Sequence, residues 1–136
     1  MNYLIGVLLA LASVLLALVV GFDRRTFYAT MLIVVATYFV LFAVMSGVMR
    51  PVVLESAVMA LFIVLAAVGY RRGEWIVAAG LAAHGLSDFV HGAVIANPGT
   101  PSWWPGFCAS YDIAAAIALM WIIRPASQMR AQGVTT

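Results

Sequence analysis

The stretch NYLIGVLLALASVLLALVVGF, residues 2–22, decides the fold class, because it contains no charged side chain from end to end. The charged residues Asp23, Arg24 and Arg25 follow it directly. A helix needs about 20 consecutive, mostly apolar residues to cross the hydrocarbon core of a bilayer. The stretch therefore predicts a transmembrane helix.

The same stretch differs from a secretory signal peptide in the position of its charges. A signal peptide begins with basic residues and ends at a cleavage site made of small residues. Here no basic residue precedes the apolar run, and the two arginines come after it. We therefore expect this first span to be retained in the protein, with its N-terminus outside.

The whole chain of 136 residues shares this apolar character. Hydrophobic residues make up 65% of it and charged residues 9%, whereas soluble proteins average about 25% charged. All seven basic residues are arginines spread along the chain, which excludes a disordered chain, a coiled coil and a nucleic-acid-binding protein. The single cysteine, Cys108, excludes a disulfide framework within the chain and a cysteine-based zinc ribbon. We expect one integral membrane domain over residues 1–136, with the lipid bilayer as its partner.

The positions of the charges divide the chain into five apolar runs, which predict an all-α, polytopic transmembrane helical bundle. The predicted spans are residues 2–22, 27–49, 52–70, 75–96 and 107–123. A transmembrane β-barrel is excluded because its strands alternate with a period of two residues, which this sequence lacks. Pro125 follows Arg124 and is expected to stop the last helix.

The arginines predict how the protein is oriented in the membrane. With five spans, one side holds six of them and the other side holds only Arg50; the six are Arg24, Arg25, Arg71, Arg72, Arg124 and Arg130. Because cytoplasmic loops are rich in arginine and lysine, the C-terminus is predicted to be cytoplasmic and residues 97–106 to lie outside. This pattern fits a multi-pass protein of a bacterial inner (plasma) membrane. Trp103 and Trp104 in the outer loop are expected to anchor the chain at the lipid headgroups.

Five ionisable residues fall inside the predicted spans: Glu55, His84, Asp88, His91 and Asp112. They come from three different spans, and the predicted orientation places all of them in the outer half of the bilayer. An ionised side chain at the centre of a membrane helix costs about 2.5–3.5 kcal/mol on insertion scales. Such residues indicate a functional site by default.

The fourth span carries three of these residues at positions i, i+4 and i+7, namely His84, Asp88 and His91, which places them on one helix face. We therefore predict a metal site with His84, Asp88, His91 and Asp112 as ligands. Glu55 is a further ligand or a proton acceptor. Two imidazoles with two or three carboxylates suit Zn²⁺, Fe²⁺ or Mn²⁺ better than Cu(I), which prefers sulfur.

Simpler interpretations stay open for each of these residues. A hydrogen-bonded network that fixes helix packing without metal would also keep the buried groups paired, and Arg50 near the outer surface is a further partner for Glu55 or Asp112. Cys108, four residues before Asp112, is either a small apolar filler, a metal ligand or a thiol near a histidine. Small residues in stretches 78–85 and 114–118 predict that the fourth and fifth spans pack closely, which brings Asp112 toward Asp88 and His91.

Two sequence motifs in this region resemble those of a known protein family. His84-Gly85-Leu86-Ser87-Asp88-Phe89-Val90-His91, followed by Trp103-Trp104-Pro105-Gly106-Phe107-Cys108, resembles a family of small bacterial polytopic membrane proteins of unknown function. The entry to the second span, residues 23–28, is also similar to that family. The resemblance implies that the polar motif and the outer loop belong together, and it implies no activity.

Three functions are compatible with this pattern. The first is a metal-binding membrane protein, in which a metal-activated water would hydrolyse a lipid-like or other small-molecule substrate; the sequence does not establish that the protein is an enzyme. The second is a small proton- or cation-coupled carrier, and the third is a scaffold or accessory subunit. A homo-oligomer is compatible with all three. No nucleotide or flavin is expected, because the chain has no glycine-rich phosphate loop or dinucleotide fingerprint.

Overall fold

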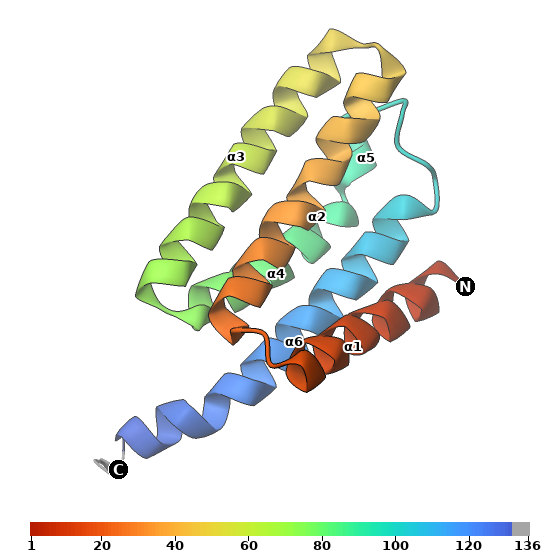
Figure 1. The fold of residues 1–136 in the computed structure, drawn as a ribbon. Coiled ribbons are helices and arrows are strands. Elements are labelled where there is room, and N and C mark those ends of the chain that lie inside the picture. Colours follow the sequence, from red (N-terminus) through yellow and green to blue (C-terminus); the bar gives the residue numbers. More distant parts are fainter. Residues whose placement is uncertain (132–136) are drawn as a thin grey trace.

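The computed structural model describes residues 1–131, with the side chains of residues 1–124. The described residues form helices joined by short links, without a strand (Figure 1). The helices are α1 (Asn2–Val20), α2 (Arg24–Ser46), α3 (Met49–Arg72), α4 (Glu74–Asp88), α5 (His91–Val94) and α6 (Trp104–Ala131). The predicted all-α class is confirmed.

Within the described residues, four helices are long and apolar enough to cross a membrane: α1, α2, α3 and the segment Trp104–Arg124 of α6. Many of their large apolar side chains are exposed on the outside of the bundle, such as Leu15 of α1 and Val64 of α3. This is the surface expected of helices that face lipid. The predicted count of five spans is not confirmed, because α4 has 15 residues and reaches only about 22 Å, less than a hydrocarbon core of about 30 Å.

The prediction of one continuous helix over residues 75–96 is wrong. At the C-terminal end of α4, the backbone N–H groups of Phe89 and Val90 donate to the carbonyls three residues before them, at 3.3 and 3.1 Å. These bonds tighten the last turn as in a 3₁₀-helix. The Ser87 hydroxyl also donates to a carbonyl three residues back, at 2.7 Å, a bond that bends helices. The helix therefore ends before residue 91, where a second short helix begins.

The limits predicted for the last span also differ from the structure. The helix begins at Trp104, before the predicted start at residue 107, and its backbone continues to Ala131. The expectation that Pro125 stops it is wrong. Proline removes one intrahelical hydrogen bond, but its fixed φ of about −65° is itself helical, so the backbone can continue through it.

Helix α6 lies between α1 and α4, while α2 packs against α3 and α4 (Figure 1). Consecutive helices are therefore not always neighbours: α1 leads into α2 along the chain but packs against α6. The interior between α2, α4 and α6 is filled by apolar side chains that include Leu32, Leu81 and Leu119, one from each helix and all fully buried.

Polar contacts fix the end of the bundle where α2 and α4 begin. Arg24 of α2 donates twice to Glu74 of α4, from Nε to Oε1 at 2.6 Å and from Nη2 to Oε2 at 2.9 Å. Asp23 caps α2 by accepting from the Thr26 backbone N–H at 2.8 Å and from its hydroxyl at 2.6 Å. The hydroxyl bond, more than the backbone bond, lowers the pKa of Asp23. The first contact joins α2 to α4, the helix that carries His84 and Asp88, and the second caps the start of α2.

Helices α4 and α6 approach each other closely at Gly85. A Cβ atom on this glycine would lie 2.9 Å from the carbonyl oxygen of Ala109 and 3.0 Å from the Cβ of Asp112. Small residues allow this kind of backbone approach in membrane bundles. The predicted close packing of these two segments is confirmed.

Substitution of Gly85 by alanine tests this contact. We expect Gly85→Ala to lower the free energy of unfolding by about 1–3 kcal/mol, the usual cost of overpacking, because the added methyl group meets backbone on α6. Gly92→Ala is the matched control, since a Cβ there meets nothing within 4 Å and both positions are helical. Unfolding in detergent micelles, followed by circular dichroism, measures the difference. Equal stability of the two variants would contradict the close approach.

Candidate metal centre

The structure places all five ionisable residues of the predicted site in the bundle interior. Glu55, His84, Asp88 and Asp112 are at most 3% exposed, and the His91 side chain is 11% exposed. Their hydrogen bonds divide them into two groups. His84 pairs with Asp112, and His91 pairs with Glu55.

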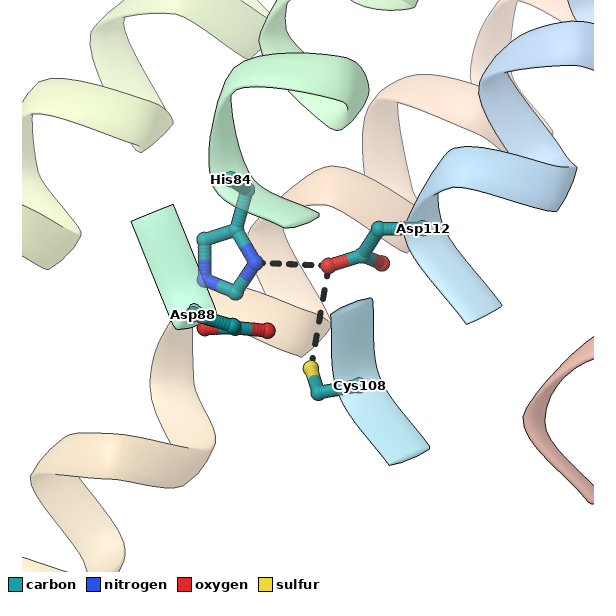
Figure 2. Close-up of side chains that lie close together, drawn as sticks. All are labelled: His84, Asp88, Cys108 and Asp112. Carbon is teal, nitrogen blue, oxygen red and sulfur yellow. Dashed lines mark hydrogen bonds and ion pairs between the residues drawn. The ribbon is translucent and has the colours of Figure 1, made fainter. Parts of the chain in front are cut away.

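The first group consists of His84 and Asp88 from α4 with Cys108 and Asp112 from α6 (Figure 2). Each residue offers one potential ligand atom, and these four atoms all lie within 4.8 Å of one another. The two residues on each helix are four positions apart, so they project from the same face of that helix. The contact at Gly85 turns these two faces toward each other.

The hydrogen bonds of this group converge on one atom, Oδ2 of Asp112. His84 Nδ1 donates to it at 2.6 Å, and Cys108 Sγ donates to it at 3.6 Å, as the dashed lines of Figure 2 show. The His84 ring also lies edge-on to the ring of Phe62, with 4.8 Å between centroids. These contacts hold the imidazole in place from two sides.

The carboxylate of Asp88 lies close to these side chains but forms no hydrogen bond with them of the kind that His84 and Asp112 share. Both of its oxygens are buried, and neither has a hydrogen-bond partner among the described residues. The Oδ1 atom of Asp112 is likewise buried without a hydrogen-bond partner among the described residues. Burying an unpaired carboxylate costs several kcal/mol, and buried polar groups are almost always paired. The unpaired oxygens therefore indicate that a cation or a proton belongs at this group.

The chemistry of the donor set suits a transition-metal ion. A nitrogen, a sulfur and carboxylate oxygens are the ligands that Zn²⁺ takes in tetrahedral sites. Metal–ligand bonds of 2.0–2.3 Å give ligand–ligand distances of about 3.3–3.8 Å. The separations of up to 4.8 Å exceed a tetrahedral edge by about 1 Å. The four residues are thus a group that could hold a metal ion.

This group contains three of the four predicted ligands, His84, Asp88 and Asp112, and in place of His91 it contains Cys108. Sequence reasoning weighed Cys108 as a ligand but left it out of the predicted set. The signal that pointed to it was its spacing of four residues from Asp112. Thiolate is a ligand for zinc, iron or copper(I) rather than for manganese, so a ligand set that includes Cys108 makes manganese the weaker candidate.

The second group joins His91 to α3 and to the loop before α6. His91 Nε2 donates to Glu55 Oε1 at 2.8 Å, and Asn97 Nδ2 donates to the same oxygen at 3.0 Å. Asn97 Nδ2 also donates to the Phe39 carbonyl at 3.0 Å. The His91 ring stacks on the Phe39 ring, with 3.9 Å between centroids. Asn97 is a member of the network that sequence reasoning did not identify.

The break between α4 and α5 explains why His91 joins this second group. The spacing of i, i+4 and i+7 places three residues on one face only if the helix turns by about 100° per residue throughout. Helix α4 ends at Asp88, and His91 begins the separate short helix α5. The face that His84 and Asp88 share therefore does not extend to His91, whose imidazole pairs with Glu55 of α3 instead.

The loop that carries Asn97 is bound tightly to α2. The Thr100 N–H donates to the Asn97 carbonyl at 3.1 Å, which closes a turn with Pro98 and Gly99 at its centre. A Cβ on Gly99 would lie 1.9 Å from the Phe42 carbonyl oxygen. Only glycine permits this approach, so the residues between Asn97 and Thr100 act as a fixed attachment of the loop to α2.

Two substitutions of Glu55 test the second group. Glu55→Ala removes an acceptor shared by His91 and Asn97, and leaving buried donors unpaired costs about 1–3 kcal/mol of stability. Glu55→Gln keeps an acceptor oxygen at this position, so we expect this variant to lose clearly less stability than Glu55→Ala. Chemical unfolding of both variants in the same detergent gives the comparison. If the alanine variant were as stable as the glutamine variant, Glu55 would not hold this network together.

A comparison of the chain with protein-family models, with curated proteins and with solved structures finds no match.

Proposed function

We propose that this protein is an inner-membrane protein that binds a divalent metal ion through His84, Asp88, Cys108 and Asp112. The observation that carries the proposal is the Asp88 carboxylate, which is buried with both oxygens unpaired among the described residues. A bound cation supplies the missing partner. It also balances two carboxylates and a thiol that face a single imidazole.

A purely structural network explains the site less well. Such a network stabilises a bundle when all of its members are hydrogen-bonded, and a partly satisfied one is worse than an apolar core. The pair between His84 and Asp112 meets this condition on its own. Asp88 adds a desolvation cost without a bond in return, so its place beside the pair needs a function.

Zinc or iron(II) fits the donor set best, with manganese as the weaker choice because of the Cys108 sulfur. A bound metal ion of this kind lowers the pKa of a coordinated water and supplies a nucleophile for hydrolysis. We propose hydrolysis of a lipid-like or other small-molecule substrate as the chemistry of the site. Glu55 remains the candidate proton acceptor, with its Oε1 held by His91 and Asn97.

Two further functions remain candidates with different requirements. A proton- or cation-coupled carrier needs polar groups that connect the site with both membrane faces, but the stretch of α4 from residue 75 to residue 83 is apolar. A scaffold or accessory subunit needs neither metal nor substrate. The resemblance to small bacterial membrane proteins favours none of the three functions.

Metal analysis of the purified protein tests the proposal. We expect about one zinc or iron ion per chain, as in other sites with one set of four ligands. Asp88→Asn and Cys108→Ser should each lower the affinity by about 10-fold or more, since even outer partners of a metal site contribute this much. Elemental mass spectrometry after dialysis against a competing chelator measures both effects.

His91→Ala is the matched control, because it removes the other membrane histidine. Retention of metal in this variant would support the group of four residues around Cys108. Loss of metal in it, together with retention in Cys108→Ser, would instead support the ligand set predicted from the sequence. Wild-type protein that carries no metal from either aerobic or anaerobic preparations would refute the proposal and leave the carrier or the scaffold.

We propose further that the chain crosses the membrane five times, with α4 and α5 together forming the fourth crossing. The C-terminus would then be cytoplasmic, as the arginine distribution predicts. Reporter fusions test this: green fluorescent protein after residue 131 should fluoresce, and alkaline phosphatase at the same point should be inactive. Phosphatase inserted after Thr100 is the control and should be active. The opposite result at both points would overturn the orientation.

A further inference from the structure

A cleft of about 720 Å³ lies between α1 and α2, with α6 as its floor. The two helices diverge from their link because α1 packs against α6 while α2 packs against α3 and α4 (Figure 1). Leu9 of α1 and Val34 of α2 line the cleft from opposite sides, and both side chains are about half exposed. The cleft is therefore open to the surroundings of the bundle.

The cleft follows α2 along most of its length. Its lining includes residues of α2 from Thr26 to Tyr38, a distance of about 18 Å along the helix. This exceeds half of a hydrocarbon core, about 15 Å. Apart from Asp23 and two threonines near one end and two tyrosines near the other, the lining is mostly apolar. An apolar space of this kind does not hold ordered water, so at this depth of a bilayer hydrocarbon fills it.

The volume of the cleft is that of a site for a small molecule. At about 720 Å³ it falls within the range of small-molecule sites, about 300–1,000 Å³. Together with the mostly apolar lining and the position of the cleft between two membrane-length helices, this size suits the hydrocarbon chain of a lipid.

One residue belongs to both the cleft and the candidate metal centre. Cys108 lines the floor of the cleft and is one of the four clustered potential ligands. Trp104, one helical turn before it, lines the same floor, and its Nε1–H is buried without a partner among the described residues. Because that nitrogen has no accessible surface, Trp104 contributes the apolar surface of its ring to the floor. The floor of the cleft thus adjoins a potential metal ligand.

We infer that this cleft binds the acyl chain of a membrane lipid, with the chain lying against the floor that α6 forms and that includes Cys108. The lipid enters from the bilayer between α1 and α2. Because Cys108 belongs both to that floor and to the four potential ligands, a lipid is the substrate class of the metal centre; this last step rests on the proposed function, whereas acyl-chain binding does not.

Photolabelling of the full-length protein tests the inference. The protein is reconstituted in vesicles of phosphatidylethanolamine and phosphatidylglycerol that contain a phospholipid with a diazirine in its acyl chain. After irradiation, we expect labelled peptides that contain Phe107 and Tyr111, which line the floor of the cleft. Leu9→Trp and Val34→Trp, which fill the cleft from opposite walls, should each reduce this labelling several-fold.

Val64→Trp is the matched control, because Val64 is an exposed valine of α3 outside the cleft; this variant should leave the labelling of α6 unchanged. Floor peptides labelled no more than the exposed face of α3 would overturn the inference, as would labelling that neither cleft variant reduces. Floor residues shielded by a second copy, seen as covalent dimers, would overturn it as well.

Metal analysis of the same samples separates the inference from the proposed function. Asp88→Asn should lose metal and keep the acyl labelling. Labelled wild-type protein without metal would refute the metal centre and retain the lipid cleft. Metal-loaded protein without labelling of the floor would refute the cleft and retain the metal centre.

Discussion

The close approach of α4 and α6 at Gly85 is the constraint on which the candidate metal centre depends. Lipid tails are as apolar as leucine, so helices in a bilayer gain little hydrophobic energy from association and are held by close packing. A glycine opposite Ala109 permits that packing at the level where His84 and Asp88 face α6. The positions of the buried polar side chains thus follow from a backbone contact.

Desolvation explains how the remaining charged groups are arranged. Each of the two histidines is next to a carboxylate from another helix, His84 to Asp112 and His91 to Glu55. The side chain of Phe39 contacts both imidazole rings, with centroid distances of 6.3 Å and 3.9 Å. Paired groups of this kind can be buried at low cost, whereas Asp88 has no pair among the described residues. Asp88 is therefore the member of the group that a bound cation or a proton would pair.

The fold class and most helix positions could be predicted from the sequence, because charges and apolar runs report directly on burial in lipid. The break after Asp88 could not, since it depends on hydrogen bonds at Phe89 and Val90 that hydropathy does not reveal. His91 lies beyond that break, in α5, and pairs with Glu55. A buried cysteine looks like an apolar filler in sequence, and only the contact between α4 and α6 places its sulfur beside Asp112.

The candidate centre is bordered by hydrogen-bonded residues on the side of the loop before α6 and by an apolar cleft on the side of the bilayer. Toward the loop before α6, Asn97 is bound to Glu55 and to the backbone of α2, and Gly99 lies against that same helix. Toward the bilayer, Cys108 lies on the floor of a cleft with half-exposed apolar walls. The side toward the bilayer is lined mostly by apolar side chains, whereas the side toward the loop is closed by hydrogen bonds. The side toward the bilayer is therefore the one by which the proposed lipid would approach the centre, because an acyl chain on that side stays among apolar groups.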